Sequence, residues 1–399
     1  MVKLVDRSQV WLGFKKWLIF CLLLGGLIGT LFLPTLGPWI WDPHLKRPYL
    51  SFTGDPRYSI GITFETPVAC NTTIYYGTSI TNLNNSQTEL VAKTLHFFNL
   101  TNLHANTTYY YLINSTNVEY DFMNKVEWFR TAPEPGLTPF KFVVIGDSRT
   151  DSFGNCRHSD LVPLMVQETP NIVLNVGDIV GGPTREDNWD RFFYEIHPLA
   201  KNVPYMVAIG NHELYEWGGE ADQGQTYRFY MNYPGNEMYY SYQYGNALFL
   251  AIDTSDLTHL TQEQIEWVNH TLAMANASGV INWIFPYFHR PAYSAGGNNQ
   301  EIIDALVPLF EKYRVDIVFM GHDHHYERMN VSGITYIITG GGGAELDWLI
   351  GSTPWTEFYA NTYQFCSVTV NGYHLTFNCI DSRGRIIDSF QLTAWRNIP

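Results

Sequence analysis

The sequence predicts an N-terminal transmembrane helix, then an all-β sandwich, then an α/β domain in which helices cover a sheet. Three observations along the 399 residues indicate this order. An uncharged apolar stretch comes first, short aromatic and β-branched segments follow, and strands then alternate with helical segments. A hydrophobic fraction of 45% is enough for an extensive packed core, and the length favours two domains over one.

The apolar stretch spans residues 17–41 and contains no charged residue. It is long enough to cross a bilayer as a helix. Lys15 and Lys16 precede it and no cationic pair follows closely, so the positive-inside rule places residues 1–16 in the cytoplasm and the chain after about Asp42 outside. A cleaved signal peptide, giving a secreted protein, is the alternative. An uncleaved signal-anchor is favoured because the run is long for a signal peptide and lacks a small-x-small cleavage site.

Eight N-x-S/T sequons support an external, glycosylated protein. They begin at Asn71, Asn84, Asn99, Asn106, Asn114, Asn269, Asn276 and Asn330. The formal net charge of −14 argues against a nucleic acid partner, since a phosphate backbone requires a basic face. A small phosphorylated substrate is compatible with this charge, because a local cationic site can exist in an acidic protein.

The cysteines allow disulfides outside the cell. Cys21 lies in the apolar stretch, which leaves four others, Cys70, Cys156, Cys366 and Cys379. Cys366 and Cys379 flank a predicted hairpin turn, Val-Asn-Gly-Tyr, so they are the favoured pair.

The sandwich is predicted over residues 48–132, where short strands are separated by Gly, Asn and Pro turns. A Pro-rich linker follows, and the α/β domain is predicted over residues 138–395. Helical patterns occupy residues 156–169, 261–277 and 298–313. The C-terminal tail returns to hairpins that are expected to complete a sheet edge.

Polar side chains follow five predicted strands of the α/β domain at the point where each strand ends. The residues are Asp147, Asp178, Asn211, His212, Glu213, His289, His322, Asp323, His324 and His325. Ligands of α/β sheets bind at such carboxyl ends. Carboxylate, amide and imidazole groups together suit borderline transition metals, and so many ligands predict two ions ~3.5–4 Å apart, a device for displacement at phosphorus. A single residue of this kind is usually an ordinary helix cap or a core histidine. That explanation does not account for an ordered series of such residues at five strand ends.

Three segments of this series carry a family resemblance: Gly-Asn-His-Glu at 210–213, Phe-His-Arg-Pro-Ala-Tyr-Ser at 288–294 and Gly-His-Asp-His-His-Tyr-Glu-Arg at 321–328. They resemble the calcineurin-like metallophosphoesterases, and most closely the purple acid phosphatase-like branch. The upstream sandwich is similar to the fibronectin type III-like domain of that branch. The resemblance implies a four-layer αββα catalytic sandwich and covers about residues 48–395.

The resemblance also implies roles for the site residues. One ion would be held by Asp147, Asp178 and His324, with Asp178 bridging to a second ion held also by Asn211, His289 and His322. His212 would act as general acid beside the leaving group, and Glu213 would either orient it or be a surface carboxylate. The implied reaction is hydrolysis of a phosphate monoester by a hydroxide activated by two ions such as Fe, Zn or Mn. Phosphodiester hydrolysis and an inactive binding or adhesion ectodomain are the alternatives.

The sequence departs from the family pattern at two positions. Arg149 stands where a histidine is common, and Gly181 stands where purple acid phosphatases have a tyrosine, so a purple colour is not expected. Arg149 would hold the substrate phosphate or brace its loop. His158 either replaces a missing ligand or is an ordinary helix-face histidine. The aromatic segment 213–240 is expected to form a long loop that shapes substrate access, unless its tyrosines pack on the sandwich.

Overall fold

The computed structural model describes most of the chain after residue 45. The described residues are 46–115, 120–150, 157–215, 221–257, 260–348 and 351–396. The predicted tail at 1–16 and the apolar stretch at 17–41 lie outside them. Among the described residues, no helix is long and apolar enough to cross a bilayer. Residues 42–399 form one compact unit, which contains both predicted domains.

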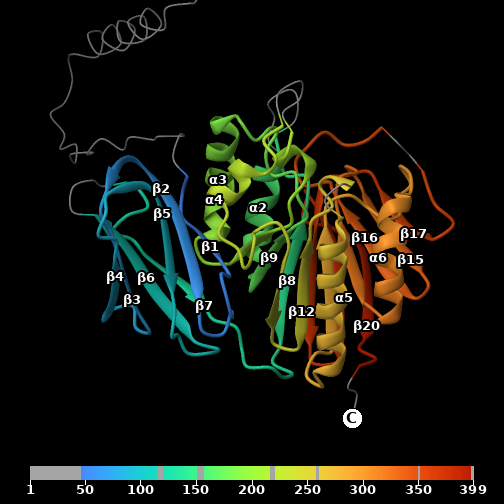
Figure 1. The fold of residues 1–399 in the computed structure, drawn as a ribbon, viewed down its shortest axis with the longest axis horizontal. Helices are drawn as coiled ribbons and strands as arrows, with labels where there is room; N and C mark the ends of the chain where they lie inside the picture. The colour runs from blue at the N-terminus through green and yellow to red at the C-terminus, as the bar shows by residue number, and fades with distance from the viewer. Residues whose placement is uncertain are drawn as a thin grey trace, which may run out of the picture. The chain divides into compact units, whose positions relative to one another are not determined.

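The first part of this unit consists of two antiparallel sheets, one in the order β1-β2-β5 and one in the order β4-β3-β6-β7 (Figure 1). The strands are β1 (Tyr49–Ser51), β2 (Ile60–Cys70), β3 (Thr72–Gly77), β4 (Asn85–Thr88), β5 (Lys93–Leu100), β6 (Thr108–Ser115) and β7 (Val126–Arg130). Alternation along β6 buries Tyr109, Tyr111 and Ile113 on one face. Two sheets form over the predicted region, and the assignment to the fibronectin type III class stays a prediction.

The second part contains two mixed sheets. The six-stranded sheet has the order β10-β9-β8-β18-β19-β20, in which β8, β9 and β10 are parallel. Its strands are β8 (Phe140–Ile145), β9 (Ile172–Asn175), β10 (Tyr205–Val207), β18 (Gln364–Asn371), β19 (His374–Asp381) and β20 (Ile386–Thr393). The C-terminal hairpins therefore extend this sheet from β8 to its edge, as predicted.

The seven-stranded sheet has the order β11-β12-β13-β14-β16-β15-β17, with a parallel centre of β12, β13, β14 and β16. Its strands are β11 (Tyr240–Tyr244), β12 (Ala247–Ile252), β13 (Trp283–Phe288), β14 (Ile317–Met320), β15 (Tyr326–Val331), β16 (Ile334–Thr339) and β17 (Thr356–Ala360). Every residue of β13 and β14 is buried, which is why these strands read as continuous apolar runs.

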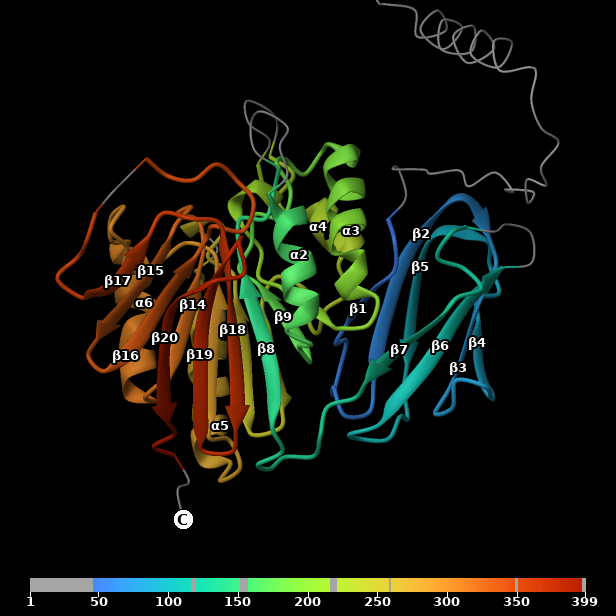
Figure 2. The same cartoon turned by 180° about the vertical axis from the view of Figure 1, so that it is seen from behind.

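Helices cover the outer faces of the two sheets. They are α2 (His158–Gln167), α3 (Glu186–Ala200), α4 (Gln225–Tyr230), α5 (Gln262–Ala277) and α6 (Gln300–Lys312). Figure 2 shows α2 in front of β8 and β9, and Figure 1 shows α5 over the other sheet. Between the sheets, Phe142 packs on Phe249 and Phe285 at ring-centroid distances of 5.2 and 5.1 Å. The layers follow the predicted αββα order.

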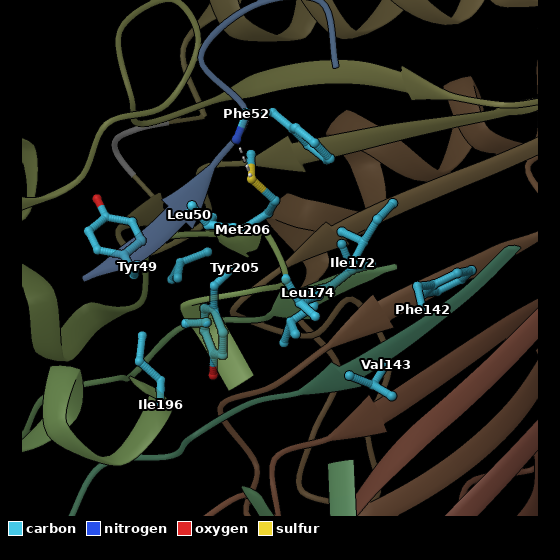
Figure 3. Packing of buried hydrophobic residues seen from close by; sticks show 14 of the residues in the cluster. Tyr49, Leu50, Phe52, Phe142, Val143, Ile172, Leu174, Ile196, Tyr205 and Met206 are labelled. Atoms are coloured by element: carbon cyan, nitrogen blue, oxygen red, sulfur yellow. Dashed lines mark hydrogen bonds between the residues drawn. The ribbon is translucent and has the colours of Figure 1, made fainter. Parts of the chain in front are cut away.

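The sandwich and the six-stranded sheet share a core (Figure 3). The Phe52 N–H donates to the Met206 sulfur at 3.3 Å, so the end of β1 lies against β10. Tyr49 packs on Phe193 of α3, with ring centroids 5.2 Å apart. Beside this contact, the buried Lys46 ammonium binds three carboxylates, those of Glu65 (2.6 Å), Asp190 (2.9 Å) and Glu186 (3.0 Å).

The favoured disulfide is not present. Cys366 and Cys379 face each other across β18 and β19, as the predicted hairpin requires, but both thiols are free and buried. Their sulfur atoms lie 3.9 and 3.6 Å from the side-chain oxygen of Gln364, to which each thiol donates a weak hydrogen bond. A thiol can thus be accommodated at both positions without oxidation.

The segment expected to be a long loop contains α4 and packs closely in its described part. Tyr227, Tyr230 and Tyr233 are buried. The Tyr49 hydroxyl donates to the Tyr230 carbonyl at 2.8 Å, which ties the segment to β1. The alternative in which its tyrosines pack on the sandwich therefore holds for Tyr230, whereas the Tyr227 and Tyr233 hydroxyls donate to the Val207 and Tyr205 carbonyls of β10.

Candidate metal centre

The predicted ligands come from the carboxyl ends of strands in both sheets. Asp147, Asp178 and Asn211 follow β8, β9 and β10, and Asn211 opens a 3₁₀ turn that runs to Glu213. His289, His322 and His324 follow β13 and β14. Because the two sheets pack face to face, these ends meet. The His322 N–H donates to Asp147 at 2.9 Å, a bond that joins the two sheets directly.

Three potential ligand atoms converge on the Nε2 atom of His289, which makes four with His289 itself. Its Nε2 atom lies 3.0 Å from the Asn211 side-chain oxygen, 3.2 Å from an Asp178 oxygen and 3.2 Å from His322 Nδ1. The opposite nitrogen, Nδ1–H, donates to the Val176 carbonyl at 2.9 Å. In the neutral ring, that bond fixes the tautomer in which Nε2 presents its lone pair to the cluster. The four side chains proposed for the second ion therefore fit a transition metal.

The side chains expected to hold the first ion are also close. His324 Nε2 lies 3.5 Å from Oδ1 of Asp147. This carboxylate oxygen is buried and has no hydrogen-bond partner among the described residues. A buried anionic oxygen without a partner is costly, so the position suits a cation.

The backbone is strained at three of these residues. Asp147 and Asp178 both have φ of 54°, and His322 has φ of 71°. Such left-handed conformations are unfavourable for side chains larger than glycine and are frequent at functional sites. The glycine run at 340–343 packs against the same loops, and a Cβ on Gly342 would overlap the Gly146 carbonyl oxygen. The run therefore permits close packing of the ligand loops.

His212 lies beside the cluster and is 17% exposed. Its backbone N–H donates to Asp178 at 2.9 Å, and its Nε2 atom lies 3.8 Å from the same carboxylate. Its Nδ1 atom is 3.1 Å from the Gly181 carbonyl, which accepts the proton of that nitrogen. The backbone of Gly181, and not Glu213, therefore orients the ring.

Glu213 is fully buried and is therefore not a surface carboxylate. Its carboxylate holds two neighbouring loops together. It accepts backbone N–H groups at 2.8–3.1 Å from Gly210, Asp178, Ile179 and Val180. Burial and the neighbouring Asp178 raise the pKa of Glu213 to about 7. Its bonds hold the loop after β9 against the loop after β10, a role that the sequence did not indicate.

Family comparisons agree with this geometry. Residues 140–326 match the calcineurin-like phosphoesterases, and residues 333–389 match the iron/zinc purple acid phosphatase-like protein C family. Residues 140–326 form a calcineurin-like metallophosphoesterase domain. The predicted resemblance is therefore confirmed, and the second match supplies the purple acid phosphatase-like C-terminal part.

Relatives of this metallophosphoesterase include plant and animal phosphatases. A protein described as probable inactive purple acid phosphatase 1 from Arabidopsis thaliana is 29% identical over 66% of the chain and 52% of its own length. Purple acid phosphatase 15 from the same plant is 28% identical over 62% of the chain and 53% of its length. The chain thus spans about half the length of these relatives. Acid phosphatase type 7 from Mus musculus is 24% identical over 93% of the chain and 95% of its length.

The fold is shared with a solved purple acid phosphatase, PPD1 from yellow lupin seeds. The TM-score is 0.74 at 23% identity, over 87% of this chain and 74% of that one. At this identity the similarity establishes the fold of the metallophosphoesterase domain and not its substrate.

The electrostatics of the cluster are those of buried opposite charges. Burial opposes ionisation of Asp178, but His289 and His212 outweigh it and hold the pKa of this carboxyl well below its usual range. Burial also opposes protonation of His289, yet the Asp178 charge raises its pKa to about 9. Burial, together with the charge of His289, lowers the pKa of His322 to about 3. The cluster thus keeps its carboxylate charged and His322 neutral, the forms that bind metals, while without an ion His289 carries a proton that a bound metal would displace.

Arg149, one of the two positions that differ from the expected family pattern, lies near the side chains expected to hold the first ion. The Arg149 backbone N–H donates to the Asp178 carbonyl at 3.1 Å, and the positive charge of Arg149 acts on His324. The Nε atom of Arg149 is buried without a hydrogen-bond partner in the described part of the chain. His158 is buried at the start of α2, with Nδ1 3.4 Å from a Glu195 oxygen of α3.

A second group of residues supports His324. The Asp347 carboxylate accepts the His324 backbone N–H at 2.7 Å, and the Glu345 carbonyl accepts the proton on Nδ1 of that ring. Asp347 also contacts the buried His325 at 3.4 Å, whose other nitrogen lies 3.4 Å from Glu327. These bonds direct His324 Nε2 toward Asp147. They were not predicted, because Asp347 lies 23 residues along the chain from His324.

Proposed function

We propose that the chain hydrolyses phosphate monoesters at the outer face of a membrane and uses two transition-metal ions such as Fe, Zn or Mn. The convergence of Asp178, Asn211 and His322 on His289 carries this proposal, because it combines the ligand types of such ions in one buried cluster. Asp147 and His324 supply a second position beside it. The ions would supply Lewis acidity and a water nucleophile at neutral pH.

The residues of the chain have distinct roles in this proposal. His212, which is held by the Gly181 carbonyl and stands next to Asp178, donates a proton to the leaving-group oxygen. Arg149 binds the phosphoryl oxygens, a role supported by its unpartnered Nε atom and its position near His324. Glu213 and Asp347 hold the ligand loops in place.

An external location is supported by the sequence and by exposure. The uncharged stretch 17–41 has the length of a membrane anchor. None of the eight sequon asparagines is buried. Glycans require such accessible positions, so every predicted site is compatible with glycosylation in a secretory compartment.

Two other functions are favoured by specific observations. A relative from Hordeum vulgare, 25% identical over 66% of the chain, is described as a nucleotide pyrophosphatase/phosphodiesterase, which favours diester hydrolysis on the same site. Arg149 and Gly181, together with relatives described as probable inactive phosphatases, favour a binding ectodomain without activity.

Two measurements on the full chain distinguish the monoesterase, the diesterase and the inactive ectodomain. They are metal analysis and the rates of hydrolysis of two chromogenic substrates. Two ions per chain and faster, chelator-sensitive hydrolysis of p-nitrophenyl phosphate than of bis(p-nitrophenyl) phosphate would support the monoesterase. The reverse order of rates would favour the diesterase. Fewer than one ion and no turnover with any added divalent metal would establish the inactive ectodomain. His289→Ala should abolish turnover, and the exposed His270→Ala provides a matched control.

A further inference from the structure

An arginine that has no part in the proposed hydrolysis lies beside the metal ligands. Arg290 directly follows His289 after β13 and is partly exposed. Its Nη1 atom lies 3.2 Å from Nε2 of His322, and Nδ1 of the same His322 ring lies 3.2 Å from Nε2 of His289. A single imidazole ring therefore separates the guanidinium from the ligand atoms of the cluster.

The loop after β12 holds Arg290 in place. The Arg290 backbone N–H donates to the Thr254 hydroxyl at 2.8 Å, and its Nε–H donates to the Ser255 carbonyl at 3.0 Å. The Gln264 side chain fixes this loop in turn, because it accepts the Asp253 N–H at 2.8 Å and donates to the Asp253 carbonyl at 3.1 Å. Strands β12 and β13 are parallel neighbours, so both loops lie at the edge that carries the ligands.

The charge of Arg290 is not neutralised by any carboxylate of the described residues. Its hydrogen bonds go to three uncharged groups, a hydroxyl, a carbonyl and an imidazole, and its Nη2 atom donates to no described residue. Carboxylates are abundant in this chain, which has 38 acidic residues and a net charge of −14. An arginine fork that keeps donors free is suited to bind a phosphate or a carboxylate of a ligand.

Metal binding by His322 would free a further donor of Arg290. A guanidinium can only donate, so its contact with Nε2 of His322 requires a lone pair on that nitrogen. When His322 binds an ion through Nδ1, the proton of the neutral ring lies on Nε2, and this nitrogen no longer accepts. The loaded site therefore presents Arg290 with donors on both Nη1 and Nη2.

Arg290 and Arg149 lie beside different parts of the ligand cluster. Arg149 is close enough to His324, expected to hold the first ion, for its charge to act on that ring. Arg290 instead contacts a ligand expected to hold the second ion. Its charge also acts on the hydroxyl of Tyr215, three residues after His212. Since His212 is the proposed proton donor to the leaving group, Arg290 lies on the leaving-group side.

We infer that Arg290 binds a second anionic group of the substrate, a carboxylate or a phosphate carried by the leaving group. The inference rests on the proposed phosphoesterase function and narrows its substrates to monoesters with a charged leaving group. It adds a binding contact and no chemical step. Arg149 and the ions bind the transferred phosphoryl group, which leaves Arg290 for the rest of the substrate.

Binding of three phosphonates, which cannot be hydrolysed, to the full chain loaded with Zn²⁺ tests the inference. Propylphosphonate has an uncharged tail, 3-phosphonopropionate has a carboxylate in its place, and 1,2-ethylenediphosphonate has a second phosphonate. Isothermal titration calorimetry should show at least about tenfold tighter binding of one or both charged ligands than of propylphosphonate, as expected for a charge-assisted hydrogen bond. The tighter of the two identifies the anionic group.

Two variants assign this preference to a residue. Arg290→Gln keeps N–H donors but loses the charge, so it should remove the preference for the charged ligands. Arg185→Gln is the matched control, because Arg185 has a 60% exposed side chain and pairs with Asp187. It should bind all three phosphonates as the unmodified chain does.

The outcomes separate this role of Arg290 from the proposed function. Equal affinities of the unmodified chain for the three ligands would overturn the inference and leave the function intact. An equal loss for all three ligands in Arg290→Gln would assign the residue to the transferred phosphoryl group and overturn the inference. A loss of metal from Arg290→Gln that accounts for its lower affinity would make the residue a support of His322, with the same consequence. If no phosphonate binds the loaded chain, the proposed function fails together with the inference.

Discussion

At the scale of single residues, His212 separates catalysis from metal binding. Its ring is fixed by the Gly181 carbonyl, and no role as a ligand is proposed for it. His212→Asn should therefore lower kcat by about 10²–10⁴-fold, the range of a lost general acid, while metal content stays unchanged. The exposed His270→Asn should leave both quantities unchanged. A loss of metal in His212→Asn would show that the residue is a ligand and would refute the assignment.

For Asp347 we expect a loss of metal, in contrast to His212. It accepts the His324 N–H and contacts His325, so its removal should misplace the ring that faces Asp147. Loss of such supporting bonds weakens metal binding about 10–100-fold, and Asp347→Ala should retain one ion and lose the other. Metal titration followed by mass spectrometry measures this. Glu357→Ala, which removes an exposed partner of Arg328, is the control. Full retention of both ions would contradict the proposed role.

At the scale of elements, the sequence indicated the candidate ligands but not the residues that hold their loops in place. Gly-Asp and Gly-His pairs directly after apolar strands can be recognised in the sequence alone. The structure brings all six proposed ligands to one edge. Glu213 and Asp347 have no such signature, because their partners are backbone N–H groups whose positions depend on loop packing. For the same reason the hairpin around Cys366 was predictable, whereas the redox state of its thiols was not.

Helix α3 carries a histidine that should make stability depend on pH. Burial lowers the pKa of His197 to about 4, and its Nδ1–H donates to the Pro48 carbonyl at 3.1 Å. The unfolded chain takes up this proton near pH 6.5, so stability is fully present above pH 6.5 and falls as the pH drops toward 4. At pH 5 the loss should be about 1–2 kcal/mol relative to pH 7.

Chemical denaturation of the metal-free protein at both pH values measures this loss. His197→Gln keeps a hydrogen-bond donor but cannot take up a proton, so it should remove most of the difference. The exposed His374→Gln serves as the control. An unchanged pH dependence in His197→Gln would show that another group is responsible.

At the scale of the whole molecule, Lys46 joins the sandwich to α3. It is 2% exposed, and although burial disfavours its charge, Glu65 and Asp190 outweigh this and raise its pKa. Lys46→Met would remove the cation that these three carboxylates share, one of them the buried Asp190, and should cost about 3–5 kcal/mol of unfolding free energy. Lys141→Met, which removes a more exposed pair with Glu168, should cost at most about 1 kcal/mol. Equal effects in denaturant titrations would contradict a special role for Lys46.

The order of the sandwich and the α/β domain along the chain could be predicted from periodicity and turn residues. Their packing into one shared core could not. The contact of Phe52 with Met206 and the ion cluster around Lys46 join residues more than 140 positions apart. Nothing local in the sequence marks such pairs. A Pro-rich linker suggests independent domains, whereas the structure places one core across the boundary.

The division of the six proposed ligands between the two sheets has a thermodynamic consequence. Each sheet contributes three of the six side chains, so a bound ion is a cross-link that the unfolded chain cannot form. At a free metal concentration 1,000-fold above Kd, each ion would add about 4 kcal/mol to the stability of the folded state. Chelator should therefore lower the melting temperature measurably, and His289→Ala should remove much of that difference. The supply of metal would then set not only the rate of turnover but also the lifetime of the protein.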